Sequence, residues 1–151
     1  MKKVSVQCRN IRLAYGSTEV LKNVNLNIQP GEFFALLGPS GSGKSTLLRL
    51  IAGFNKHQHG ELLVDGRDIG QQEPWDRNIG MVFQSYTLFP WLTVEQNVCF
   101  GLREKNMPQA EQREIAAHFI GKVGLKGFEQ HFPKQLSGGM QQRTALARAL
   151  A

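Results

Sequence analysis

A glycine-rich segment, residues 38–46, constrains the fold of this chain more than any other feature. It follows a continuous apolar run at residues 33–37 and precedes four aliphatic residues at helical spacing, namely Leu47, Leu48, Leu50 and Ile51. This pattern predicts a buried strand, then a tight loop, then a helix that ends near Gly53. A strand, loop and helix in this order are the context in which a glycine-rich loop can hold phosphate groups.

The segment fits the pattern G-x-x-x-x-G-K-[ST], and each fixed residue has a physical task. The glycines let successive backbone N–H groups point at phosphate oxygens, and a side chain at Gly41 or Gly43 would obstruct that hollow. The start of the following helix is the positive end of its dipole, which also attracts phosphate. We expect Lys44 to meet the outer phosphates and the Ser45 hydroxyl to bind Mg²⁺. The predicted phosphate-binding residues are Gly38, Pro39, Ser40, Gly41, Ser42, Gly43, Lys44, Ser45 and Thr46.

Alternative explanations of this segment are weaker. A glycine-rich turn at a helix start requires neither the lysine nor the hydroxyl residue that follows it. A dinucleotide-binding fingerprint that starts at Gly41 requires glycine at position 46, where the chain has Thr46. The segment is therefore predicted to bind the phosphates of a nucleotide rather than a dinucleotide.

Composition describes a globular domain, or part of a larger one. The chain has 151 residues, of which 41% are hydrophobic and 20% charged, so disordered and collagen-like classes are excluded. No apolar run approaches the roughly 18 residues that span a bilayer, and we expect no export signal. Cys8 and Cys99 show no metal-ligand spacing and are predicted to be buried thiols of a reduced compartment. The net charge of +6 permits anionic partners, but the basic residues are dispersed, so nucleic acid is not expected.

Short alternating or apolar runs predict several strands. Residues 4–8 and 24–28 alternate in polarity, as in a sheet with one solvated face. Residues 62–64 predict a strand that enters a turn at 65–66, and residues 79–83 predict a further short buried strand. The sheet is thus expected to be assembled from separated pieces.

The second half of the chain is predicted to be mostly helical. Thr93 and Gln96 form a capping-box pattern that opens a helix through about Leu102. A second helix is predicted from about Pro108 to Gly124. Ser137 is expected to open a last helix, with three apolar residues along one side, namely Leu146, Ala149 and Leu150.

The start of that last helix carries a second candidate site. Its sequence is Leu136, Ser137, Gly138, Gly139, Met140, Gln141, Gln142 and Arg143. Ser137 is predicted to be the N-cap of this helix. The two glycines expose backbone N–H groups at the helix terminus, and these donors suit an anion. An ordinary capped helix start explains the same residues equally well.

Together, residues 38–46 and 136–143 resemble the Walker A and signature motifs of the ATP-binding-cassette (ABC) family. The resemblance covers nearly the whole chain. It implies an α/β fold of the P-loop NTPase type, with a RecA-like core, an antiparallel β subdomain and a helical subdomain at about 88–140. On this resemblance, residues 1–151 form a partial nucleotide-binding domain whose C-terminal part is missing.

The resemblance also implies ligands and roles for single residues. ATP and Mg²⁺ are the expected cofactors, Tyr15 matches the aromatic that stacks on adenine, and Gln84 matches the Q-loop glutamine. Lys44 and Gln84 are then catalytic residues, and Ser45 and Gln84 bind Mg²⁺. Two cassettes of the family close head to tail, so the partner's ATP is expected to contact Ser137, Gly138, Gly139 and Gln141.

Residues 83–90 and 93–98 are similar to bacterial solute importers of the polyamine, iron, phosphonate and sulfonate or nitrate groups. Trp91 favours the sulfonate and nitrate type, whereas residues 52–54 and 100–102 favour polyamines, and the conflict stays open. The implied partners are a second ABC subunit, transmembrane permease subunits and, indirectly, a solute-binding protein. The implied location is cytoplasmic, peripheral on the inner face of the cell membrane. The aromatic segment 89–91 indicates either a docking surface or a local core cluster.

Three catalytic elements of the family follow its signature helix: the Walker B aspartate, an adjacent glutamate and a switch histidine. No apolar run that ends in Asp-Glu occurs in these 151 residues. The histidines, which are His57, His59, His118 and His131, lie in predicted helices or loops and are expected at the surface. We therefore expect ATP binding with little turnover, and exposed apolar surface at open sheet edges.

Two alternatives to an importer subunit remain. One is a remnant that binds nucleotide without hydrolysing it. The other is a soluble ABC ATPase of DNA repair or translation. Repair ATPases insert a long coiled coil between the two motifs, and the intervening residues here show no sustained heptads.

Overall fold

The computed structural model describes residues 3–151, which divide into two compact units. Unit 1 is Met1–Ile79 and unit 2 is Gly80–Ala151. Among the described residues, no helix is both long and apolar enough to span a bilayer. The predicted helical subdomain at 88–140 lies within unit 2, and its status as a subdomain stays a prediction.

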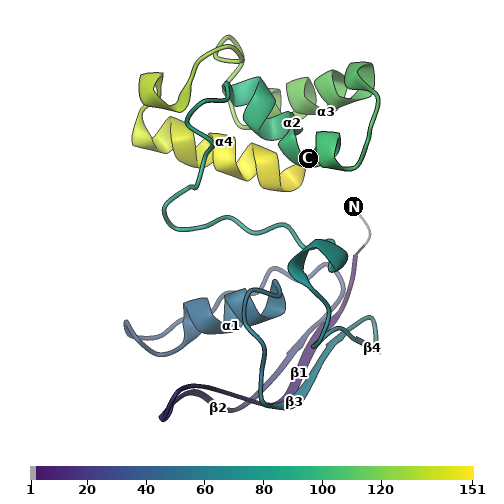
Figure 1. The fold of residues 1–151 in the computed structure, drawn as a ribbon, viewed down its shortest axis with the longest axis vertical. Helices are drawn as coiled ribbons and strands as arrows, with labels where there is room; N and C mark the ends of the chain where they lie inside the picture. Colours follow the sequence, from purple (N-terminus) through teal and green to yellow (C-terminus); the bar gives the residue numbers. More distant parts are fainter. Residues whose placement is uncertain (1–2) are drawn as a thin grey trace. The chain divides into compact units, whose positions relative to one another are not determined.

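Unit 1 contains a four-stranded antiparallel sheet (Figure 1). Its strands are β1 (Val6–Tyr15), β2 (Thr18–Ile28), β3 (His59–Val64) and β4 (Arg67–Asp68), and their spatial order is β2-β1-β3-β4. A two-residue turn joins β1 to β2, with Tyr15 opposite Thr18. The strands predicted in the first thirty residues, and the strand before the turn at 65–66, are confirmed.

Helix α1 (Lys44–Ile51) shares the core of unit 1 with this sheet. Leu47 and Leu50 supply its buried face, as their helical spacing predicts. The buried sheet residues of the same cluster include Cys8, Ile11, Leu13, Leu21 and Leu62. This packing fixes where α1 begins, and the glycine-rich loop ends at that point.

Two predicted strands are wrong. Residues 33–37 and 79–83 have no strand conformation, because no described residue pairs with either segment. A strand exists only through pairing, so apolar sequence alone does not make one. Phe33 is 97% exposed and Leu37 is 92% exposed, so apolar surface is exposed as expected, but on an unpaired segment rather than at a sheet edge.

A buried arginine closes the other end of α1. Arg77 follows the short 3₁₀ helix η1 (Pro74–Asp76) and is 8% exposed. Its guanidinium donates to the carbonyl oxygens of Leu50 and Ile51 at 2.8 and 3.0 Å, and to those of Gly70 and Gln72. The last carbonyls of a helix lack intrahelical partners. The Gly53 N–H also donates to the Leu50 carbonyl at 3.1 Å, so Arg77 adds a charged donor there and supplies one to the Ile51 carbonyl.

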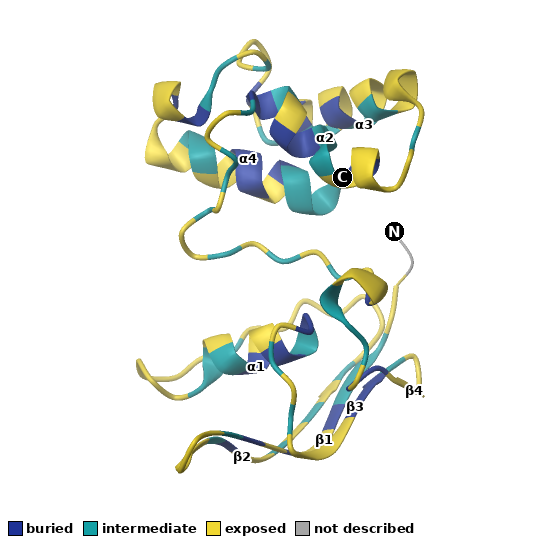
Figure 2. Ribbon diagram, viewed as in Figure 1, coloured by how far each residue is buried: buried dark blue, intermediate teal, exposed yellow. Residues whose placement is uncertain are grey.

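Unit 2 is a three-helix cluster in which α2 (Val94–Glu104), α3 (Gln109–Lys122) and α4 (Gly138–Leu150) pack together (Figure 1). The 3₁₀ helix η2 (Pro133–Gln135) precedes α4. The buried residues gather where the helices meet, as Figure 2 shows, and they are Val94, Val98, Ala116, Ile120, Leu125, Leu136 and Ala147. All three predicted helices are confirmed, and so is the capping box of Thr93 and Gln96.

The buried face of α4 is Thr144, Ala145 and Ala147, whereas Leu146 is 43% exposed. The histidine expectations need correction. His59 is exposed as expected but begins β3 rather than lying in a loop or helix. His57 and His131 each bury one ring nitrogen that has no hydrogen-bond partner among the described residues, so they are not simple surface side chains.

The cysteine prediction is confirmed for one thiol and only partly for the other. Cys8 is 2% exposed, and burial raises its pKa to about 11. Cys99 is half-buried, and its pKa is also raised, first by burial and then by the nearby Glu95 carboxylate.

We predict that replacing Arg77 by alanine lowers the free energy of unfolding of unit 1 by about 2–4 kcal/mol, because buried carbonyls lose a charged donor. Urea unfolding followed by Trp75 fluorescence in a Trp91→Phe background measures the change. The control is Arg67→Ala, since Arg67 is exposed. Equal stability of the two variants would contradict the capping role.

We also predict that iodoacetamide modifies Cys99 faster than Cys8 in the native chain at neutral pH. The thiolate is the nucleophile, and both the burial of Cys8 and its raised pKa reduce thiolate access. Mass spectrometry of peptides at timed intervals measures both rates. In urea the two rates should converge, and convergence already in the native chain would argue against the burial of Cys8.

Candidate functional site

The glycine-rich loop is folded around the side chain of Lys44. The Lys44 ammonium donates to the carbonyl oxygens of Gly38 and Pro39 at 2.9 and 2.6 Å, and to Ser42 Oγ at 3.2 Å. These acceptors belong to the same loop that the sequence pattern assigns to phosphates. The ammonium therefore lies inside the loop, where the oxygen atoms of a bound ligand could also reach it.

The loop glycines are required for two different reasons. Gly43 has a φ of +89°, and a Cβ there would lie 2.9 Å from Leu21 Cδ2 and 3.2 Å from the Val20 carbonyl oxygen. Gly41 has a φ of +81°, but a Cβ there would meet nothing within 4 Å. Gly41 is thus needed for its left-handed backbone, whereas Gly43 also needs the space beside β2.

The start of α1 is left open for an acceptor. Its N-cap is Gly43, which has no side chain to cap with, and its first turn contains no acidic residue. The ladder of α1 begins at the Leu47 N–H, which donates to the Gly43 carbonyl at 2.8 Å. The N–H groups of Lys44, Ser45 and Thr46 precede that bond and therefore lack intrahelical acceptors. These donors, the helix dipole and the ammonium together suit an anionic oxygen ligand.

An apolar hollow of about 340 Å³ adjoins the loop on unit 1. Its lining consists of Leu26, Ile28, Phe34, Leu36, Leu48 and Ile51, together with Lys44 and Ser45 of the site. Part of this lining comes from the unpaired apolar segment 33–37. The N–H groups at the start of α1 and the Lys44 ammonium, which suit an anion, are therefore bordered by apolar surface on one side.

The β1–β2 hairpin connects Tyr15 to the strand that packs against the end of the glycine-rich loop. It is the last residue of β1, is 52% exposed and pairs with Thr18 at the start of β2. Val20 and Leu21, a few residues further along β2, are the residues against which Gly43 packs. The hairpin thus carries the exposed aromatic ring on the same strand pair that abuts the end of the loop.

The second predicted anion site lies in unit 2, at the start of α4. Ser137 caps the helix, with its Oγ accepting from the Met140 N–H at 3.3 Å. Gly138 and Gly139 are exposed, and a Cβ on either would meet nothing within 4 Å. Gln141 is engaged locally, because its Nε2 donates to the carbonyl oxygens of Pro133 and Leu136 at 3.0 and 3.3 Å.

Gln84 also belongs to unit 2 and is exposed. The backbone just after it is strained, since Tyr86 and Thr87 have φ values of +61° and +44°. Arg148 of α4 holds this segment by donating to the carbonyl oxygens of Tyr86 and Thr87 at 3.3 and 2.9 Å. Sequence analysis missed this role of Arg148, because nothing in the sequence relates it to residues 61 or 62 positions earlier.

An aromatic cluster follows in unit 2. The Phe89 ring lies 4.3 Å from that of Phe100 and 5.8 Å from that of Trp91, which is 69% exposed. The buried Asn97 amide holds the preceding loop, accepting from the Phe89 N–H and donating to the carbonyls of Phe89, Leu92 and Thr93. The sequence analysis did not predict this role of Asn97. The available signal was an amide side chain between Val94 and Val98, on the apolar face of a helix, where a polar group needs hydrogen-bond partners. The segment is thus both a local cluster and a partly exposed aromatic surface.

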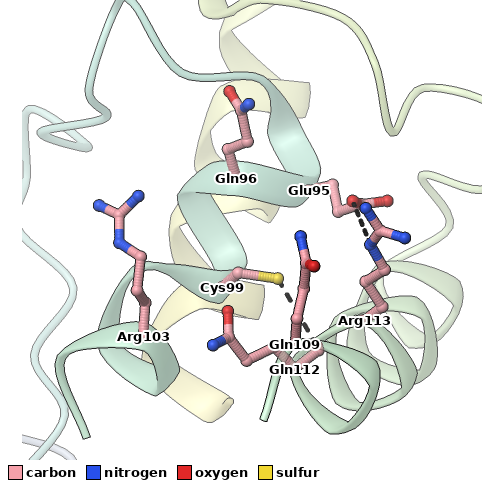
Figure 3. A pocket seen from close by; sticks show the side chains of 7 residues that line it. All are labelled: Glu95, Gln96, Cys99, Arg103, Gln109, Gln112 and Arg113. Atoms are coloured by element: carbon pink, nitrogen blue, oxygen red, sulfur yellow. Dashed lines mark hydrogen bonds and ion pairs between the residues drawn. The ribbon is translucent and has the colours of Figure 1, made fainter. Parts of the chain in front are cut away.

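Unit 2 also contains a polar hollow of about 200 Å³ between α2 and α3 (Figure 3). Arg113 Nε lies 4.0 Å from Glu95 Oε1, and the Cys99 thiol donates to the Gln112 carbonyl at 3.6 Å. Arg103 lies at its opposite edge. None of the sequence-predicted site residues lines this hollow.

Comparison with known sequences identifies the family of this chain. The ABC transporter family matches residues 21–151. The putrescine transport ATP-binding protein PotG of Escherichia coli (strain K12) is 47% identical over 146 residues, which are 97% of this chain and 39% of that protein. The Fe(3+) ions import ATP-binding protein FbpC of the same strain is 46% identical over 149 residues, or 99% of this chain and 43% of that protein. The chain therefore spans about two fifths of the length of these curated relatives.

Solved structures agree in fold. A bacterial ABC transporter cassette, MJ0796, solved as a dimer, matches this chain with a TM-score of 0.88 and 41% sequence identity. The match covers 97% of this chain and 69% of the MJ0796 chain. The same cassette in a post-hydrolysis state, bound to ADP and Pi, has a TM-score of 0.86. These likenesses confirm the predicted α/β P-loop fold class. The chain belongs to the ABC transporter family.

Proposed function

We propose that this chain is the ATP-binding part of an ABC importer subunit, which couples Mg²⁺-ATP binding and hydrolysis to solute uptake across the cytoplasmic membrane. The observation that carries the proposal is the open start of α1, with the Lys44 ammonium inside the glycine-rich loop. The relatives named for putrescine transport and Fe(3+) import support the importer assignment.

Lys44 and the first turn of α1 hold the phosphates in this proposal. The backbone N–H groups of Lys44, Ser45 and Thr46 donate to phosphate oxygens, and the Lys44 ammonium exchanges loop carbonyls for the outer phosphates. Because the ammonium already has oxygen acceptors within 3.2 Å, binding replaces one set of acceptors by a more strongly charged set.

Ser45 and Gln84 are the proposed protein ligands of Mg²⁺. A hydroxyl at the first turn of the helix is an oxygen donor of the kind that Mg²⁺ accepts, with water and phosphate oxygens in the other positions. The bound ion would neutralise charge that develops on the phosphates. Gln84 contributes a side-chain oxygen from the exposed segment before Tyr86.

Tyr15 is the proposed adenine contact. Its exposed ring stands at the end of β1, on the hairpin whose second strand packs against Gly43. An aromatic face stacks on any base without needing a particular hydrogen-bond pattern.

A second ABC subunit is the proposed partner of the α4 start. Ser137, Gly138 and Gly139 would contact the ATP held by the partner's loop, and the open space beside both glycines supports a close approach. The related cassette solved as a dimer supports this arrangement. Gln141 would act by holding the loop before Ser137, as its bonds to Pro133 and Leu136 suggest.

Permease subunits are the proposed membrane partners, with a solute-binding protein acting through them. The exposed Trp91 ring and its neighbours in unit 2 offer a docking surface of the aromatic kind that interfaces favour. The protein would then lie peripherally on the cytoplasmic face of the membrane.

We predict that Lys44→Ala weakens binding of Mg²⁺-ATP by about tenfold or more, because a charged donor to phosphate is lost. Isothermal titration calorimetry on the chain measures the affinity. Lys22→Ala serves as the control, since Lys22 is an exposed lysine of β2. Equal affinities for the two variants would argue against the loop as the phosphate site.

We further predict that these 151 residues bind Mg²⁺-ATP but hydrolyse it about 100-fold more slowly than a full-length ABC cassette assayed beside them. The reason is that no residue of the chain is assigned to orient the attacking water. A phosphate-release assay over several hours measures the rate, with Lys44→Ala as the background. A rate within about tenfold of the full-length cassette would show that another group performs this task.

A further inference from the structure

The side chain of Gln58 occupies the place of a missing strand residue beside β1. The last registered pair of β1 with β3 joins Arg12 to His59, so β1 continues to Tyr15 with no β3 residue opposite Ala14. Gln58 Oε1 accepts from the Ala14 N–H at 2.9 Å, and its Nε2 donates to the Ala14 carbonyl at 3.2 Å. The Gln58 backbone N–H donates to the Arg12 carbonyl at 3.0 Å. One glutamine thus continues the β3 side of the ladder beyond its last pair.

An amide side chain suits this pair of bonds. It presents one acceptor and one donor on neighbouring atoms, as a peptide group does, whereas a carboxylate accepts but cannot donate. Both bonds end on Ala14, which is 44 residues away in sequence and directly precedes Tyr15. The contact therefore fixes both polar backbone groups of the residue that orients the Tyr15 Cα.

The opposite side of β1 is less regular at the same point. The register of β1 against β2 shifts between Leu13 and Ala14, just before the Tyr15 and Thr18 pair. An irregular ladder constrains backbone direction less than a continuous one, so support from the β3 side matters most here. Gln58 supplies that support.

We propose that Gln58 is a positioning residue that holds the end of β1 so that the Tyr15 ring is presented for stacking on a nucleotide base. This proposal rests on the proposed function, in which Tyr15 contacts adenine. It assigns base affinity to a residue that touches neither the base nor the phosphates.

The test compares two ligands that share phosphates but not a base. Mg²⁺-ATP and inorganic tripolyphosphate with Mg²⁺ are titrated calorimetrically into the wild-type chain, Gln58→Ala, Gln58→Glu and the control Gln71→Ala. Gln71 is an exposed glutamine of the same unit. We expect both Gln58 variants to weaken ATP by about threefold to tenfold and to leave tripolyphosphate affinity unchanged. Unchanged ATP affinity, or equal losses for both ligands, would overturn the proposal.

A Tyr15→Ala background separates positioning from direct contact. If Gln58 acts through Tyr15, then Gln58→Ala causes no further loss of ATP affinity once the ring is absent. An additional loss of the same size in that background would overturn the proposal. Unchanged ATP affinity of Tyr15→Ala alone would also overturn it, because the stacking role would be absent.

Amide hydrogen exchange tests the positioning step without nucleotide. The Ala14 N–H should exchange at least about threefold faster in Gln58→Ala than in the wild-type chain, and Gln71→Ala should leave it unchanged. An unchanged rate at Ala14 would overturn the proposal whatever the chain binds. Failure of the wild-type chain to bind both ligands would instead refute the proposed function, so the two failures are distinguishable.

Discussion

The packing of α1 against the antiparallel sheet of unit 1 is the constraint on which the candidate site depends. Leu47 and Leu50 bury against strands β1, β2 and β3, and each such side chain contributes about 1.5–3 kcal/mol. Arg77 then fixes the far end of the helix through its carbonyls. With both ends of the helix held, the first turn of α1 has one position relative to β2. Glycine is then the residue type that fits at position 43 without a clash against β2. The loop geometry is thus a consequence of core packing.

The starts of α1, α2 and α4 differ in how their free N–H groups are satisfied. Thr93 caps α2 through a capping box, and the carbonyls of Glu129 and His131 accept from its next donors. Ser137 caps α4 with a single bond. At α1 the cap is a glycine, and a lysine side chain lies nearby instead of an acceptor. This difference separates a helix start that is finished internally from one that can receive an anion, and a partly capped start such as that of α4 lies between them.

The sequence predicted those features that local physics determines. The capping box of Thr93 and Gln96, the hairpin strands and the loop before α1 follow from residue type and spacing over a few positions, and the structure contains them. The strands at 33–37 and 79–83 were wrong, because pairing depends on partners that an apolar run does not specify. Gln58, Arg77 and Arg148 escaped notice for a similar reason. Each one bonds to backbone atoms far away in sequence, and such contacts leave no periodic signal.

The most direct test of this account is the response of backbone amides to Mg²⁺-ATP, followed by ¹H–¹⁵N NMR on the labelled chain. If the open start of α1 holds the phosphates, the signals of Gly41, Gly43, Lys44 and Ser45 should shift in a saturable manner. The signals of the α2 start, where Thr93 already caps the helix, should stay in place. Saturable shifts confined to other residues, with Gly43 and Lys44 unchanged, would contradict the assignment of this loop as the nucleotide site.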